Sequence, residues 1–256
     1  MNTPAGLAGL GVLVTRPAHQ AQAQMACVEN AGGRPVPLPL LSIAGPPDPA
    51  AARAALQAAH TAAWWVFTSP NAVRWAAQLA ADEPAAWPAR LAAAGRGTAA
   101  ALAALGRTDA YCPAMDGAAG LLALPELAAL TAGAHVAVLC GAHNPPWLAS
   151  GLQARGIRLQ TVHVYRRVRV AHDVAQVTQA LAAVDAAIVT SGEALEHLCA
   201  LTPASVVPRL HGLKLALPSA RVVEMARTLG FGQVPLVPQR VSDEGFVQAL
   251  VAWRNS

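Results

Sequence analysis

The chain has 256 residues, of which 54% are hydrophobic and 12% charged, and its formal net charge is +4. This mild charge, without a dense basic run, argues against a nucleic-acid partner and favours a small anionic ligand. No stretch has the composition of a membrane span and no secretory leader opens the chain, so we expect a cytoplasmic protein without a membrane partner.

The basic residues and the cysteines further indicate which ligands and which cellular compartment to expect. Lys214 is the only lysine, so the remaining basic residues are arginines, whose planar guanidinium suits carboxylate or phosphate. The four cysteines are far apart and share no CxxC spacing: Cys27, Cys112, Cys140 and Cys199. They are typical of reduced thiols in a cytosolic protein, and we expect no metal site.

The first half of the chain alternates short apolar runs with alanine-rich helical segments. Strands are expected over 10–14, 64–67, 90–94 and 111–113. Helices are expected over 20–30, 50–59, 72–81, 99–105 and 117–130, the last with Pro125 inside it or at a break. The extended stretch 35–41 carries proline at alternate positions, which predicts an edge strand or a linker because proline cannot donate to a ladder.

The second half repeats this alternation. Strands are expected over 135–140, 159–164, 186–189, 213–217 and 234–237. Helices are expected over 147–154, 174–182, 193–201, 222–229 and 243–253. The alternation predicts an α/β fold with parallel sheets.

The stretch 64–73 joins a buried strand to a helix through two hydroxyl residues. Thr68 and Ser69 follow the strand, and Pro70 is typical of a first helical position. Ligands of open α/β sheets bind at such strand ends, and the free N–H groups of a helix start favour an anion. Ser69 alone also fits a plain helix cap.

This stretch has an echo later in the chain. Three pairs of similar segments share an offset of 121 to 124 residues: Thr68 with Thr190, Thr98 with Ser219, and Val12 with Val136. Three pairs in one order at nearly one offset predict an internal duplication of an α/β unit.

Two loops also draw attention. Residues 95–98 read as a tight turn, in which Gly97 lets the backbone approach a ligand or serves an ordinary turn. The loop 141–146 contains His143, which is either a ligand or base, or simply solvated.

Taken together, the motifs resemble the uroporphyrinogen-III synthase family over residues 12–253. The segments that carry the resemblance are Val14-Thr15-Arg16-Pro17, Phe67-Thr68-Ser69-Pro70-Asn71-Ala72-Val73, Gly95-Arg96-Gly97-Thr98-Ala99, Leu121-Leu122, Val164-Tyr165-Arg166-Arg167, Val189-Thr190-Ser191, and Pro218-Ser219-Ala220-Arg221 with Ala226 and Gly230-Phe231. Each motif is short, and their order and spacing make the resemblance specific.

The resemblance implies two flavodoxin-like α/β domains with parallel sheets, related by internal duplication. One domain would combine residues 1–40 and 168–256, and the other would span 41–167, with linker strands near 35–41 and 159–169. It also implies a monomer that needs no cofactor.

The resemblance further implies a lyase of tetrapyrrole and haem biosynthesis. It would close the linear polycarboxylate hydroxymethylbilane into uroporphyrinogen III, inverting ring D and releasing water. Tyr165 matches the tyrosine implicated as proton donor, although packing with one structural hydrogen bond is an alternative. Substrate contacts, offered mostly by backbone N–H groups at helix starts facing a cleft between the domains, are expected at Thr15, Arg16, Thr68, Ser69, Asn71, Gly97, Thr98, Gly141, Thr190, Ser191, Gly192, Ser219 and Arg221.

One departure from the family pattern leaves an alternative open. Relatives often show Arg-Gly and then Gly-Arg after the strand that matches 136–139, and here residues 140–146 contain no arginine. The chain could therefore be a divergent, non-catalytic two-lobed protein that senses an anionic metabolite. A nucleotide or flavin site is disfavoured, because no Walker loop and no GxGxxG follows a strand.

Overall fold

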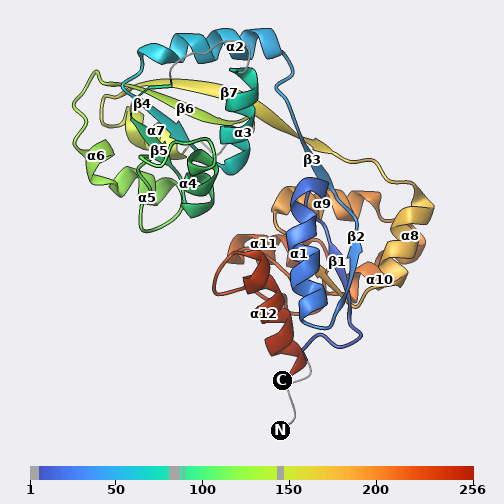
Figure 1. The fold of residues 1–256 in the computed structure, drawn as a ribbon. Helices are drawn as coiled ribbons and strands as arrows, with labels where there is room; N and C mark the ends of the chain where they lie inside the picture. Colours follow the sequence, from blue (N-terminus) through green and yellow to red (C-terminus); the bar gives the residue numbers. More distant parts are fainter. Residues whose placement is uncertain (1–5, 81–86, 89, 143–146) are drawn as a thin grey trace. The chain divides into compact units, whose positions relative to one another are not determined.

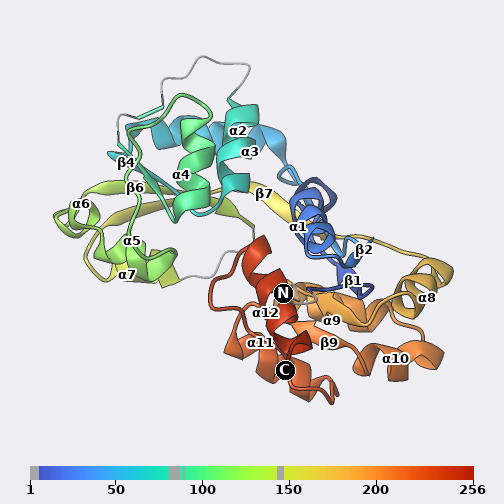
Figure 2. The ribbon, with the colours of Figure 1, turned by 60° about the horizontal axis from the view of Figure 1, so that its bottom comes forward.

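The computed structural model describes residues 6–80, 87–88, 90–142 and 147–256. The chain divides into two compact units, one formed by Met1–Ser42 with Val168–Ser256 and the other by Ile43–Arg167. Each unit has its own sheet and its own buried clusters, and Figures 1 and 2 show the elements of each.

The discontinuous unit contains a sheet whose strands run in the order β2-β1-β8-β9, with every neighbouring pair parallel. The strands are β1 (Gly11–Val14), β2 (Arg34–Pro37), β8 (Ala186–Ile188) and β9 (Lys214–Ala216). β1 is apolar and buried at all positions, as expected of a parallel strand covered on both faces. β2 lies at an edge, which confirms the expectation from its prolines.

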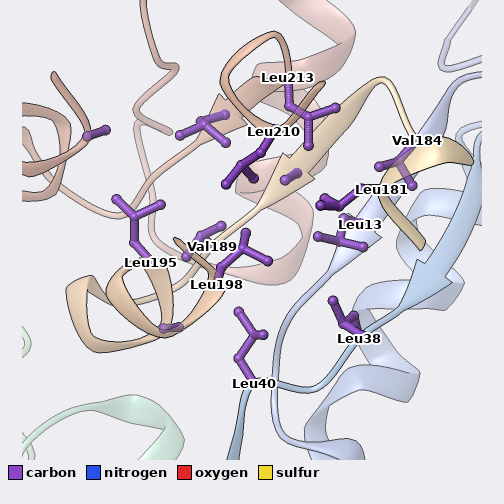
Figure 3. Close-up of a cluster of buried hydrophobic side chains, with 14 of the residues drawn as sticks. Leu13, Leu38, Leu40, Leu181, Val184, Val189, Leu195, Leu198, Leu210 and Leu213 are labelled. Atoms are coloured by element: carbon purple, nitrogen blue, oxygen red, sulfur yellow. The ribbon is translucent and has the colours of Figure 1, made fainter. Parts of the chain in front are cut away.

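Helices cover both faces of this sheet. α1 (Ala18–Asn30) and α12 (Asp243–Arg254) pack side by side on the face that carries Val12 and Ile188. The opposite face, with Leu13 and Val189 at its centre, forms the cluster shown in Figure 3. The helices that contribute to this second face are α8 (Val174–Ala182), α9 (Gly192–Leu201), α10 (Val207–His211) and α11 (Ala220–Thr228).

The continuous unit contains a sheet in the order β3-β7-β6-β4-β5. Its strands are β3 (Leu41–Ala44), β4 (Trp64–Phe67), β5 (Leu91–Ala93), β6 (His135–Gly141) and β7 (Arg158–Arg169). The pairs β7–β6, β6–β4 and β4–β5 are parallel. Successive bulky residues of β4 point to opposite faces, so Trp65 and Phe67 enter one core and Trp64 and Val66 the other.

Two helical layers enclose these cores. One consists of α2 (Pro49–Ala58), α3 (Pro70–Leu79) and α4 (Arg96–Ala103). The other consists of α5 (Ala118–Ala123), α6 (Pro125–Ala128) and α7 (Trp147–Gln153). Short 3-10 turns lie at Ala59–Thr61 here and at Ala204–Val206 in the other unit. None of the helices in the described part of the chain has the length and apolar character needed to span a membrane.

The two sheets share a strand order. The order β2-β1-β8-β9 of one sheet corresponds to β7-β6-β4-β5 of the other, with β1 in the place of β6 and β8 in the place of β4. These are the segments that the repeat offset pairs in the sequence. The common topology supports the predicted duplication, which a superposition of the two units would test.

Several predicted elements need correction. α4 begins at Arg96, so Gly97 and Thr98 lie in its first turn and not in a tight turn before it; Ala94 and the extended Gly95 make the connection from β5. The predicted strand 234–237 is reduced to a single bridge between Ala216 and Leu236, because Pro235 and Pro238 have no N–H to donate. The expected strand 111–113 is likewise one bridge at Tyr111, and α10 was not expected at all.

Candidate functional site

The end of β4 and the start of α3 form the first part of the site in the continuous unit. The backbone N–H and the hydroxyl of Thr68 both donate to the Leu139 carbonyl, at 3.1 and 3.3 Å, and fix the end of β4 against β6. Ser69 is the N-cap of α3, and its Oγ accepts a hydrogen bond from the Ala72 N–H at 3.1 Å. Pro70 occupies the first helical position, as predicted.

Tyr165 reaches this helix start from β7. The pairing of β6 with β7 shifts between Cys140 and Gly141, so that Gly141 lies opposite Tyr165 and not opposite Val164. Val162 and Val164 pack in the core under α3, and the irregularity lets Tyr165 pack against the same core. The Tyr165 hydroxyl lies 3.2 Å from the Ser69 hydroxyl.

Gly141 provides the space that the Tyr165 ring occupies. A Cβ placed on Gly141 would lie 2.7 Å from Cζ and 2.9 Å from Cε2 of that ring, closer than real contacts allow. The Ala142 N–H donates to the Tyr165 carbonyl at 3.0 Å and holds the strand at this point. The phenol is therefore fixed by its strand, its ring contact and its hydroxyl partner together.

The start of α4 lies near the start of α3. A Cβ built on Gly97 would lie 3.7 Å from the Pro70 side chain, an ordinary contact. Thr98 is buried in the first turn, and Asn71 is buried in the first turn of α3.

The carboxylate of Asp116 is a feature of this helix start that sequence reasoning missed. It accepts a long hydrogen bond of 3.4 Å from the Arg96 N–H and leaves no room for a side chain at Gly95. No motif or periodicity marks Asp116, since it lies in a turn segment after Tyr111.

Cys140 lies one residue before Gly141 but offers no nucleophile. Burial raises the pKa of its thiol from 9.0 to about 11, so the thiol stays protonated at neutral pH. Its Sγ lies 3.6 Å from Nδ1 of His163, which also lies 3.2 Å from the Gly141 carbonyl. All four cysteines are free, and nowhere in the described ranges do three His, Cys, Asp or Glu side chains gather as metal ligands.

In the discontinuous unit, the end of β1 carries Thr15 and Arg16. The buried Thr15 hydroxyl donates to the Ile188 carbonyl at 2.9 Å, so it joins the ends of two strands as Thr68 does in the other unit. Arg16 forms an ion pair with Asp243 and also donates to Gln20 at 3.1 Å. Its guanidinium therefore already has a carboxylate partner at the start of α12.

The ends of β8 and β9 bring the remaining predicted residues together. Thr190 and Ser191 follow β8, and Ser191 caps α9 by accepting from the Ala194 N–H at 3.2 Å. Gly192 is buried against Met225, and a Cβ built there would lie 3.9 Å from Nη2 of Arg221. Ser219 is the N-cap residue of α11, but its side chain makes no capping hydrogen bond. It differs in this from Ser191, whose hydroxyl oxygen accepts from the helix that follows it.

The predicted residues thus form two groups, each at the carboxyl end of one sheet. The continuous unit holds Thr68, Ser69, Asn71, Gly97, Thr98, Gly141 and Tyr165. The discontinuous unit holds Thr15, Arg16, Thr190, Ser191, Gly192, Ser219 and Arg221. His143, with the rest of the loop 143–146 that departs from the family pattern, lies outside the described residues.

Comparison with known proteins identifies one family. A family model described as "Uroporphyrinogen-III synthase HemD" matches residues 22–248. The chain is similar to the crystal structure of a mutant uroporphyrinogen III synthase from Thermus thermophilus, at 20% identity and a TM-score of 0.60, covering 96% of this chain and 98% of that one. It is also similar to uroporphyrinogen-III synthetase from Helicobacter pylori, at 15% identity and a TM-score of 0.60, covering 96% of this chain and 100% of that one. At these identities the structures establish a common fold.

Proposed function

The chain belongs to the uroporphyrinogen-III synthase family of cyclising hydro-lyases, and from that premise we propose how its own residues serve the reaction. The family acts in tetrapyrrole biosynthesis, and its reaction converts hydroxymethylbilane into uroporphyrinogen III with inversion of ring D and loss of water. The predicted family is thereby confirmed, and the α/β fold with parallel strands agrees with it.

We propose Tyr165 as the catalytic acid of this reaction. The observation that carries the proposal is its placement: the phenol lies at the start of α3, on the edge of the sheet where ligands of α/β folds bind, and only half buried. A proton given to the hydroxymethyl oxygen lets the C–O bond break and water leave. The phenol O–H of Tyr165 is a hydrogen-bond donor, so the side chain has a proton to give.

We propose that the substrate carboxylates bind at the helix starts that follow the strands. The partly positive starts of α3 in one unit, and of α9 and α11 in the other, are anion positions of this kind, and predicted residues lie at each of them. The start of α4, with Gly97 and Thr98 in its first turn, is approached by the carboxylate of Asp116. Each such contact is worth only about 0.3–1 kcal/mol at an exposed position, so several must act together. A flexible polycarboxylate meets that requirement.

The remaining parts of the proposal concern organisation. We propose domains spanning 1–40 with 168–256 and 41–167, a monomeric enzyme, and a cytoplasmic site of action. We further propose that Tyr165 supplies the proton for loss of water without a cofactor.

The decisive experiment is turnover of enzymatically generated hydroxymethylbilane. We expect the type III isomer to accumulate above the type I isomer that forms spontaneously. If the protein changed neither the rate nor the isomer ratio of spontaneous closure, which gives type I, the proposal would be contradicted and a binding protein favoured.

A further inference from the structure

We propose that Ser69 is a positioning residue for Tyr165, which orients the phenol and supports it while it donates its proton. The inference rests on the proposed role of Tyr165 as the acid. It starts from one observation, that the hydroxyls of Ser69 and Tyr165 lie 3.2 Å apart at the first turn of α3.

Either hydroxyl could donate in this hydrogen bond, and we infer that Ser69 donates to Tyr165. The Ser69 oxygen already accepts the Ala72 N–H at 3.1 Å, which uses one of its two lone pairs. That bond polarises the hydroxyl, so a chain in which Ala72 donates to Ser69 and Ser69 donates to Tyr165 is mutually reinforcing. In this arrangement the proton of Tyr165 points away from Ser69 and is free for the substrate.

The same arrangement supports the tyrosine after proton transfer. When Tyr165 protonates the hydroxymethyl oxygen, the C–O bond breaks with its electron pair on oxygen, water leaves, and Tyr165 becomes a phenolate. The Ser69 hydroxyl and the positive end of α3, a helix of 10 residues, then face that negative charge. The cyclised intermediate loses a proton to restore its aromatic ring, and the phenolate takes that proton back.

The strand irregularity gives Tyr165 an orientation that suits this role. Because Gly141 and not Val164 is its counterpart in the pairing, the ring packs over Gly141 and against the core that α3 covers. A bulge that re-aims one side chain is common beside active sites. Gly141 therefore leaves space for the Tyr165 ring, β7 sets the direction in which the side chain points, and Ser69 provides its hydrogen bond.

The other unit offers a matched control for the capping function of Ser69. Ser191 follows a threonine at a strand end, caps a helix of 10 residues, and accepts the Ala194 N–H at 3.2 Å. In the described part of the chain no tyrosine hydroxyl is paired with Ser191. Loss of either hydroxyl removes a cap, whereas only loss of Ser69 removes a partner of Tyr165.

The test is a double-mutant cycle on the full-length enzyme. Ser69→Ala should lower kcat about tenfold when Tyr165 is present and by no further factor in the Tyr165→Phe background, since Ser69 acts through the phenol. Ser69→Thr keeps a hydroxyl and should retain most of the turnover. Ser191→Ala should lower turnover by the same small factor in both backgrounds.

A second measurement is independent of activity. The chain has only two tyrosines, so a protein labelled with ¹³C at the tyrosine Cζ gives two signals, which Tyr111→Phe assigns. Ser69→Ala should shift the Tyr165 signal and leave the Tyr111 signal in place, and Ser191→Ala should shift neither.

The outcomes separate this inference from the proposed function. An equal loss from Ser69→Ala in both backgrounds, or an unmoved Tyr165 signal, would overturn the role of Ser69 while Tyr165 remained the acid. Undiminished turnover of Tyr165→Phe would instead remove Tyr165 from the mechanism, and the inference about Ser69 with it.

Discussion

At the scale of single residues, the hydroxyl groups at the strand ends serve different purposes. Thr15 and Thr68 donate to carbonyls of neighbouring strands, so their side chains hold the sheet edge together. Ser69 and Ser191 accept from their own helices. Sequence reasoning located these positions because strand, hydroxyl and helix signals follow one another directly. It could not assign the two threonine hydroxyls, because their partners Ile188 and Leu139 are far away in the sequence.

Replacement of Tyr165 by Phe tests the acid. We expect turnover to fall roughly 10²-fold, which lies within the usual benefit of general acid catalysis. The fall should not reach zero, because hydroxymethylbilane also closes unaided. Product binding should be nearly unchanged and the type III isomer should persist, since folding of the substrate and not the proton decides the isomer.

Isomer analysis and product titration check this prediction together. Turnover equal to that of the unaltered enzyme would exclude the phenol from the chemistry. A switch to mostly type I product would mean that Tyr165 shapes the substrate and does not protonate it.

Replacement of Gly141 by Ala tests whether the packing of the Tyr165 ring over Gly141 matters for turnover. The added Cβ would lie 2.7 Å from Tyr165 Cζ, so the ring must leave its present position, and we expect its hydrogen bond with Ser69 to be disturbed. We expect turnover to fall about as far as in Tyr165→Phe, with a stability loss of about 1–3 kcal/mol from overpacking. Steady-state kinetics and urea unfolding measure the two effects. If Gly141→Ala also slowed the Tyr165→Phe enzyme by the same factor, its effect would not pass through the phenol.

At the scale of elements, the start of α4 shows where sequence reasoning fails. Two glycines around Arg96 are typical of a turn, yet the helix begins at Arg96 with Gly97 inside it. Helix and turn differ here by local propensities of less than about 1 kcal/mol, which tertiary packing readily overrides. The same limit explains the missed α10. The short apolar strands β1, β4 and β8 were predictable because their residues are buried throughout.

Replacement of Gly97 by Ala distinguishes helix from turn. Gly97 has no positive φ, and a Cβ there makes only an ordinary contact with Pro70, so we expect a gain of about 0.4–1 kcal/mol in the free energy of unfolding. Gly117→Ala is the matched opposite, because its φ of 100° strains any other residue even where nothing lies within 4 Å. Urea unfolding measures the change. A loss of stability in Gly97→Ala would mean that Gly97 lies in a turn and not in a helix.

The carboxylate of Asp116 makes the start of α4 an anion position that the chain fills itself. Replacement by Ala should open this position to a substrate carboxylate and tighten product binding about twofold to fivefold, the equivalent of about 0.3–1 kcal/mol. Titration calorimetry with the product measures the change. Asp109→Ala is the control, since Asp109 is an exposed carboxylate that pairs with Arg107. Weaker binding in Asp116→Ala would show that Asp116 organises the site and does not compete for it.

At the scale of the whole molecule, one unit is formed by the two ends of the chain and the other by the segment between them. The duplicated pattern predicted two α/β lobes, and the shared strand order agrees with it. The irregular pairing that directs Tyr165 was not predictable, because it depends on contacts between β6 and β7 and not on any local motif.

This organisation predicts that the two units fold independently. Among the described residues, the cores of the continuous unit draw on residues 52–165 and those of the other unit on residues outside that range, so these clusters are separate. A fragment spanning 41–169 keeps all five strands of its sheet and should unfold in one cooperative thermal transition by circular dichroism. The complementary protein can be closed by a short glycine linker, because the Val170 N–H donates to the Leu40 carbonyl at 3.0 Å and the two cut ends are therefore adjacent. It should also fold, since its four-stranded sheet and both helical layers remain. A disordered 41–169 fragment would mean that its cores depend on the other unit, and the proposed division into domains would then fail.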